Sequence, residues 1–149
     1  MRKILPLDLF ENDEKKPIVT FDFDGVLHVG EYFFPHGTDL QKGGGGNPNV
    51  WGVSDEMVDL LNKTAKSFTC VIVSGRPAED TKLLRIFADI HRIAVSDIFC
   101  LDKSEKAQKI VDLGSVNYDD ELKILLQLQT LDYEGEFFWV QNGEIKEYE

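Results

Sequence analysis

Short apolar runs alternate with amphipathic stretches along most of this 149-residue chain, and this alternation limits the folds open to it. The apolar runs are short, rich in β-branched and aromatic residues and bounded by glycine or polar residues, as buried strands are. The predicted strands cover residues 18–21, 68–73, 98–101, 116–118 and 137–140. The predicted helices cover about 54–65, 78–89, 104–113 and 121–130. Strands that alternate with helices predict an α/β fold, a three-layer, doubly wound and mostly parallel sheet.

Two local signals mark the ends of predicted elements. Ser54 directly precedes a helical pattern with Asp55 and Glu56 in its first turn, which is typical of a helix N-cap. Asn142-Gly143 separates two short apolar stretches, which predicts a tight hairpin turn at the edge of the sheet.

The length and apolar content favour a single domain over residues 1–149, since 42% hydrophobic residues are enough for one core. We expect residues 1–16 to be loosely attached because they are highly charged. Residues 28–52 form an insertion after the first strand that contains four successive glycines, Gly43 to Gly46. No Lys-Ser or Lys-Thr follows these glycines, so the insertion predicts a flap and not a phosphate-binding loop.

Charge and hydropathy restrict the partners of the chain. No stretch approaches the roughly 20 apolar residues of a membrane span, so we expect no membrane partner and a cytoplasmic location. The formal net charge of −11 disfavours general adhesion to nucleic acid. It leaves open a nucleic-acid end as substrate, because a metal ion and a few local lysines can hold one terminal phosphate.

Asp22 and Asp24 follow the first predicted strand, just before Gly25. Side chains alternate along an extended strand, so the two carboxylates are expected on one face and Phe23 on the other. At about 4 Å, two such charges repel by roughly 4 kcal/mol at an effective dielectric near 20, which calls for a proton or a cation. A divalent metal is one solution, and an aspartate turn that caps the next segment is the alternative.

Polar residues also follow the later predicted strands. Ser74 ends the second strand, and Gly75 is expected at a helix start, where its amide and the serine hydroxyl suit a phosphoryl oxygen. Lys103 and Lys106 stand at the start of the third predicted helix. Asp119-Asp120 follow the fourth strand, whose apolar pattern Ser115 and Asn117 interrupt. Each residue alone has an ordinary structural explanation as a cap or a solvated side chain. Together, at one edge of a parallel sheet, they predict a site for phosphate chemistry.

With these motifs the chain resembles the haloacid dehalogenase superfamily of phosphotransferases. The motifs run in the family's order: FDFDGVL, VIVSGRP, a lysine and NYDDE. The resemblance covers about residues 18–148, and with the closing FFWVQNGEI it is greatest to the phosphatase domains of polynucleotide repair enzymes. The short insertion implies a cap-poor member with an open site, of the kind that acts on bulky substrates such as nucleic-acid ends.

The resemblance implies a Mg²⁺-dependent phosphomonoester hydrolase that works through an aspartyl-phosphate. Asp22 is then the nucleophile and Asp24 the general acid and base. Mg²⁺ is expected on Asp22, the backbone carbonyl of Asp24, and Asp120, with Asp119 positioning the lysine or a metal-bound water. Ser74, Gly75 and Lys106 are expected to bind the phosphoryl oxygens, with Lys103 as the alternative lysine.

Two other classes fit part of the pattern. A receiver-like signalling domain also combines acidic residues, a hydroxyl, a lysine and Mg²⁺. In such a domain the adjacent acidic pair is the first motif along the chain, whereas here it is the last. A catalytically inactive relative that binds phosphate or a partner protein keeps the same residues, and turnover distinguishes it from the enzyme.

Overall fold

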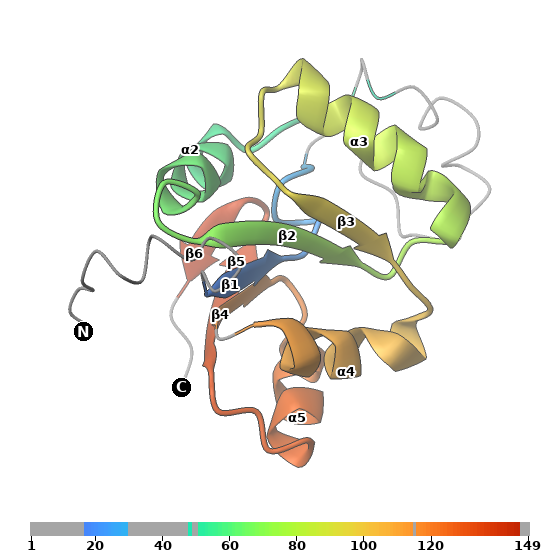
Figure 1. Cartoon of the computed structure of the whole chain (residues 1–149), viewed down its shortest axis with the longest axis vertical. Helices are drawn as coiled ribbons and strands as arrows, with labels where there is room; N and C mark the ends of the chain where they lie inside the picture. The colour runs from blue at the N-terminus through green and yellow to red at the C-terminus, as the bar shows by residue number, and fades with distance from the viewer. Residues whose placement is uncertain (1–16, 30–47, 49–50, 115, 147–149) are drawn as a thin grey trace.

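The structure is a computed structural model that describes residues 17–29, 48, 51–114 and 116–146. Most of the predicted insertion, including Gly43 to Gly46, and the predicted loose segment 1–16 lie outside these residues. The described chain forms one six-stranded sheet with two helices on each face (Figure 1).

The sheet is mostly parallel. Its strands are β1 (Ile18–Phe21), β2 (Thr69–Ser74), β3 (Asp97–Cys100), β4 (Val116–Asp119), β5 (Glu136–Gln141) and β6 (Glu144–Lys146). They lie in the order β3-β2-β1-β4-β5-β6, and only β6 is antiparallel to its neighbour among them. Because β2 and β4 both flank β1, the order reverses direction around β1, and ligands of open α/β sheets bind at such a point.

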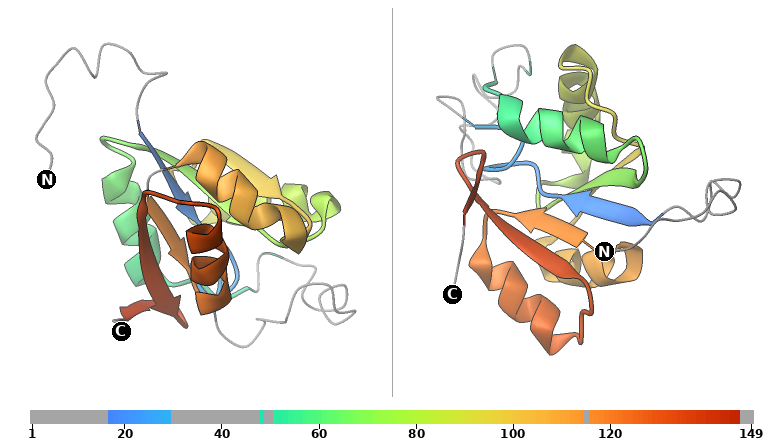
Figure 2. Two further views of the ribbon diagram at one scale, coloured as in Figure 1. Left: turned by 90° about the horizontal axis from the view of Figure 1, so that it is seen from below. Right: turned by 90° about the vertical axis from the view of Figure 1, so that its left-hand side faces the viewer.

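Four α-helices cover the sheet, and a 3₁₀ turn, η5 (Ala78–Asp80), precedes the second of them. They are α2 (Asp55–Thr64), α3 (Thr81–Ile90), α4 (Lys103–Leu113) and α5 (Leu122–Thr130). Helices α2 and α3 lie on one face and α4 and α5 on the other, which the right-hand view of Figure 2 shows from the side. The predicted α/β architecture with strands and helices alternating along the chain is confirmed.

Alternating side chains of the strands supply the two cores. On β2, Cys70 and Ile72 pack with Leu61 of α2 and Phe87 of α3. The intervening Val71 and Val73 belong to a second core with residues of α4 and α5, among them Ile110. Strands with both faces covered are mostly apolar, which explains the continuous apolar run of β2.

The polar residues of β4 do not break the sheet. Asn117 is 1% exposed, and its side-chain oxygen accepts a hydrogen bond from the Thr20 hydroxyl on β1 at 2.7 Å. The next residue of β4, Tyr118, stacks on Phe21 of β1 and on Phe138 of β5, with ring centroids 4.7 and 4.9 Å apart. These contacts across three strands fix β4 beside β1, so that Asp119 ends next to the first motif.

The predicted ends of the elements are largely confirmed. The Ser54 hydroxyl accepts the amide hydrogen bond of Met57 at 3.2 Å, as an N-cap does. Asn142 and Gly143 have φ values of 51° and 81°, the positive values that a tight hairpin turn requires. One expectation was wrong: Gly75 does not begin a helix, because η5 starts only at Ala78. Among the described residues, no helix is long and apolar enough to span a membrane.

Candidate active site

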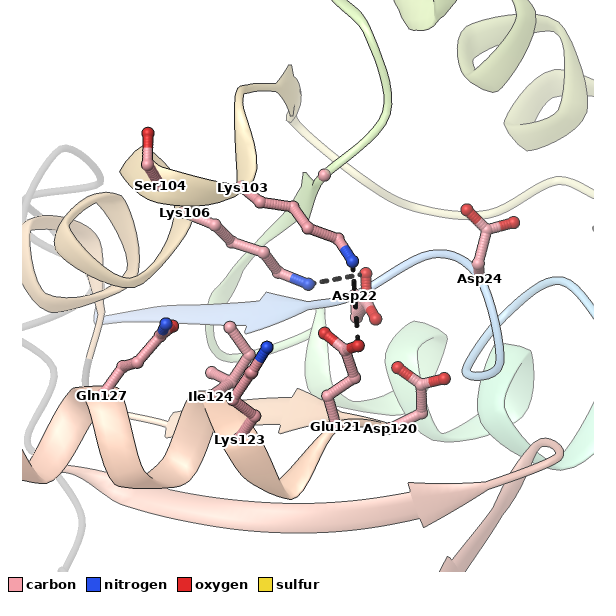
Figure 3. A pocket seen from close by; sticks show the side chains of 11 residues that line it. Asp22, Asp24, Lys103, Ser104, Lys106, Asp120, Glu121, Lys123, Ile124 and Gln127 are labelled. Atoms are coloured by element: carbon pink, nitrogen blue, oxygen red, sulfur yellow. Dashed lines mark ion pairs between the residues drawn. The ribbon is translucent and has the colours of Figure 1, made fainter. Parts of the chain in front are cut away.

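A pocket of about 370 Å³ opens at the carboxyl ends of β1, β2 and β4 (Figure 3). Its walls come from the loops after these strands, from the first turn of α4 and from the first two turns of α5. It is lined by Asp22, Asp24, Gly75, Lys103, Ser104, Lys106, Asp120, Glu121, Lys123, Ile124 and Gln127. The topology thus brings together residues from four of the predicted strand ends.

Asp22 lies at the floor of the pocket and is 5% exposed. Its amide donates a hydrogen bond to the carbonyl of Tyr118 at 2.8 Å, so β1 stays paired with β4 one residue beyond its last strand residue. Its Oδ1 accepts a hydrogen bond from the Phe23 amide at 2.8 Å and lies 3.0 Å from Nζ of Lys106. The carboxylate therefore has a fixed orientation, with one oxygen held by these two contacts.

Of the three lysines that line the pocket, Lys106 is the buried one. It is 4% exposed, and its Nζ lies 3.0 Å from both Asp22 Oδ1 and Asp119 Oδ2. Burial disfavours the charged ammonium, but the carboxylates of Asp119 and Asp22 outweigh this effect and raise the pKa of Lys106. Lys103, the alternative, is 57% exposed at its side chain and lies 3.9 Å from Glu121. Figure 3 shows the Lys106–Asp22 and Lys103–Glu121 pairs as dashed lines.

Asp119 and Asp120 complete an acidic cluster with Asp22. Each of the three offers a carboxylate oxygen, and these oxygens all lie within 4.8 Å of one another. Burial and the charge of Asp22 raise the pKa of Asp120 to about 10 and that of Asp119 to about 7. Three carboxylates beside one lysine leave an excess of negative charge, which requires protons or a cation.

This donor set fits a hard divalent cation such as Mg²⁺, which prefers carboxylate oxygens. Space for the third ligand depends on Gly25: a Cβ atom there would lie 2.7 Å from Cγ of Asp120. The carbonyl of Asp120 accepts a hydrogen bond from the indole of Trp139 at 3.2 Å, which holds the start of the following loop against β5.

Asp24 lines the same pocket, yet its carboxylate does not join the acidic cluster. Phe23 is fully buried between Asp22 and Asp24, as the alternation predicts. The chain then turns at Gly25, which has a φ of 85°, and the carboxylate of Asp24 pairs with Arg76. The sequence predicted that the carboxylate of Asp24 would lie close to that of Asp22. In the structure the carboxylates close to Asp22 are those of Asp119 and Asp120.

Ser74 and Gly75 occupy the end of β2. Ser74 is 1% exposed, and its hydroxyl oxygen accepts a hydrogen bond from the Arg76 amide at 3.1 Å. Gly75 lines the pocket, whereas Ser74 is not among the residues that line it. Of the two residues expected at the phosphate, Gly75 faces the cavity.

Sequence reasoning gave no role to Arg76 or Lys123. Arg76 belongs to the SGRP motif. Its position before a proline predicts only a loop residue, and its buried partner becomes apparent in the structure alone. It is 1% exposed, and its guanidinium donates to both oxygens of Asp24 at 2.8 Å. Lys123 stands in the first turn of α5, and with Lys103, Ser104 and Gln127 it forms the outer part of the pocket.

Comparisons with known proteins support the fold. No known protein family matches the sequence, and no curated protein matches it. Two solved structures are similar in fold, described as "Structure of the Pnkp1/Rnl/Hen1 RNA repair complex" and "Structure of Pnkp1/Rnl/Hen1 complex". The TM-scores are 0.65 and 0.66, with 14% sequence identity in each case. The likeness covers 86% and 87% of this chain but 43% and 47% of those chains, so this chain spans less than half their length.

Proposed function

We propose that this protein is a Mg²⁺-dependent phosphomonoester hydrolase of the haloacid dehalogenase type, which acts through an aspartyl-phosphate on Asp22. The observation that carries the proposal is the cluster of Asp22, Asp119 and Asp120, whose carboxylate oxygens lie within 4.8 Å of one another beside the buried Lys106. A cluster with this excess of negative charge at a pocket floor suits a divalent cation together with a phosphate group.

The residues of the site divide the reaction between them. A carboxylate oxygen of Asp22 attacks the phosphorus, and the ester P–O bond breaks as Asp24 protonates the leaving oxygen. Asp24 then removes a proton from a water molecule whose oxygen attacks the aspartyl-phosphate. The bond between phosphorus and Asp22 breaks, inorganic phosphate leaves, and both carboxylates return to their starting forms.

Charge balance explains the remaining roles. Lys106 neutralises part of the carboxylate charge, so that an anionic nucleophile can approach an anionic phosphate. Asp22, Asp120 and the backbone carbonyl of Asp24 would hold the Mg²⁺, which supplies Lewis-acid stabilisation of the phosphoryl oxygens when bound. Asp119 is fully buried against Lys106 and holds the ammonium in place. Gly75 lines the pocket, and its amide would be a further donor for a phosphoryl oxygen.

We further propose that nucleic-acid ends or nucleotides are substrates. The outer pocket carries the side chains of Lys103, Lys123 and Gln127, which can donate hydrogen bonds to a second anionic group of a substrate. The likeness to chains of an RNA repair complex, although one of fold, agrees with this substrate class.

Hydrolysis of p-nitrophenyl phosphate by the purified protein tests the reaction. We expect release of p-nitrophenolate that requires Mg²⁺ and stops with EDTA. Asp22→Asn should lower the rate at least about a thousandfold, since the covalent step is lost. Asp55→Asn, the same substitution at an exposed position on α2, should leave the rate unchanged.

Turnover that survives Asp22→Asn would remove Asp22 from the nucleophilic role. A folded protein that binds Mg²⁺ and phosphate but turns over no substrate would favour the inactive relative. If hydrolysis is found, 3'-phosphorylated oligonucleotides, 5'-nucleotides, sugar phosphates and phosphopeptides should be compared under identical Mg²⁺, because the preference among them identifies the substrate class.

A further inference from the structure

Arg76 forms a buried, two-pronged ion pair with Asp24. Its Nε donates to Oδ2 and its Nη2 to Oδ1, both at 2.8 Å. The side chain of Arg76 is 2% exposed, whereas that of Asp24 is 15% exposed and borders the pocket. Two parallel hydrogen bonds fix the plane of the carboxylate as well as its position.

The guanidinium is itself held on several sides. Its central carbon lies 4.9 Å from the centroid of the Trp51 ring and 5.3 Å from that of Phe23. Its Nη1 donates to Asp80 at 3.2 Å. Burial lowers the pKa of Arg76, but the hydrogen bonds and charges of Asp24 and Asp80 outweigh burial and raise it, so the group stays charged.

We infer that Arg76 is a positioning residue that orients the Asp24 carboxylate for proton transfer; this inference rests on the proposed function. Within the described part of the chain, Arg76 supplies the contacts to both oxygens of Asp24. Asp24 lies beyond the last residue of β1, directly before the turn at Gly25, so its side chain does not project from a strand. Without the guanidinium the carboxylate rotates about its side-chain bonds, and the distance to the leaving oxygen varies.

A leaving-group comparison separates this role from simple structural support. p-Nitrophenolate leaves without a proton, whereas the alkoxide of glycerol 2-phosphate requires one. A misplaced acid therefore lowers the rate of hydrolysis more for glycerol 2-phosphate. The quantity to compare is kcat/KM, because it covers the steps up to the first departure of the leaving group. Arg76→Lys keeps a positive charge but cannot form two parallel bonds. We expect it to lower kcat/KM about a hundredfold for glycerol 2-phosphate and about threefold or less for p-nitrophenyl phosphate.

Two further variants control the experiment. Met57→Ala opens a cavity under α2, which contributes no residue to the pocket, and should destabilise the protein without changing the ratio of the two kcat/KM values. In an Asp24→Asn background, Arg76→Lys should have little further effect on glycerol 2-phosphate, since both substitutions remove one oriented acid.

The outcomes distinguish the inference from the function on which it rests. If the wild type hydrolyses neither substrate, the proposed function fails and the role of Arg76 fails with it. If the wild type is active and Arg76→Lys lowers both kcat/KM values equally, or leaves both unchanged, only the positioning role is overturned. Additive losses from Asp24→Asn and Arg76→Lys would also overturn it.

Discussion

Gly25 and Asp120 lie in direct contact although 95 positions separate them: a Cβ atom on Gly25 would come within 2.7 Å of Cγ of Asp120. The glycine of the first motif therefore has two functions. It adopts a φ of 85°, which turns the chain after β1, and it leaves the space in which a carboxylate of the fourth strand end reaches the acidic cluster.

Substitution of Gly25 should damage the metal site and the backbone together. Gly25→Ala should destabilise the protein by about 1–3 kcal/mol, because an alanine is strained at this φ. It should also displace Asp120, so that Mg²⁺ no longer raises the melting temperature. Thermal unfolding with and without Mg²⁺ measures both effects.

Gly114→Ala is the matched control. Its Cβ would lie 2.7 Å from the carbonyl oxygen of Ile18, at the opposite end of β1 from the pocket. We expect a loss of stability with the Mg²⁺ response intact. An unchanged Mg²⁺ response in Gly25→Ala would show that Asp120 does not hold the ion.

Lys103 and Lys106, two of the three lysines of α4, should differ sharply in importance. Lys106→Met leaves Asp22 and Asp119 buried without their cation, and removing one partner of a buried ion pair costs about 3–5 kcal/mol. Lys103→Met should change the free energy of unfolding by less than about 0.5 kcal/mol, because its partner Glu121 is 3.9 Å away and both side chains are exposed. Urea unfolding of the two variants tests this, and equal losses would contradict the assignment of Lys106.

The metal-free protein should lose stability as the pH rises. Asp119 has a pKa of 3.8 when unfolded and about 7 when folded, so between these values the native state binds more protons than the unfolded state. The free energy of unfolding then falls from about pH 4 to about pH 7, and Asp120, with its pKa raised to about 10, continues the trend. Lys106 stays charged throughout this range, because its pKa is raised.

Mg²⁺ should reverse this loss, since it replaces the protons on the cluster. Melting temperatures in EDTA and in Mg²⁺ should diverge as the pH rises from about 5 to about 8. In Asp120→Asn the divergence should shrink. A Mg²⁺ effect that is independent of pH would contradict binding at these carboxylates.

Lys123 should matter for large substrates only. Lys123→Gln removes an exposed charge from the outer pocket, and we expect it to lower kcat/KM for a 3'-phosphorylated oligonucleotide about threefold, the effect of a surface ion pair. Hydrolysis of p-nitrophenyl phosphate should not change. Lys82→Gln, on the opposite face of the sheet, is the control. High salt should abolish the difference, and equal losses on both substrates would contradict a second anion contact.

The sequence alone determined the elements and their order. Apolar runs and helical periods are local properties, so they identified five parallel strands, four helices and the hairpin turn of Asn142 and Gly143. The parallel arrangement in turn predicted that Asp22, Asp120 and either Lys103 or Lys106 would gather at one edge of the sheet, because carboxyl ends of parallel strands meet there.

Only the tertiary structure decided which side chains touch. The choice of Lys106 over Lys103 depends on the phase of α4, which places Lys106 on the buried side with Ala107 and Ile110. The pairing of Asp24 with Arg76 depends on a turn after β1 and a loop after β2, which are adjacent only because β1 and β2 pair. A sequence pattern records the period of each element, whereas such contacts depend on the rotation and packing of several elements together.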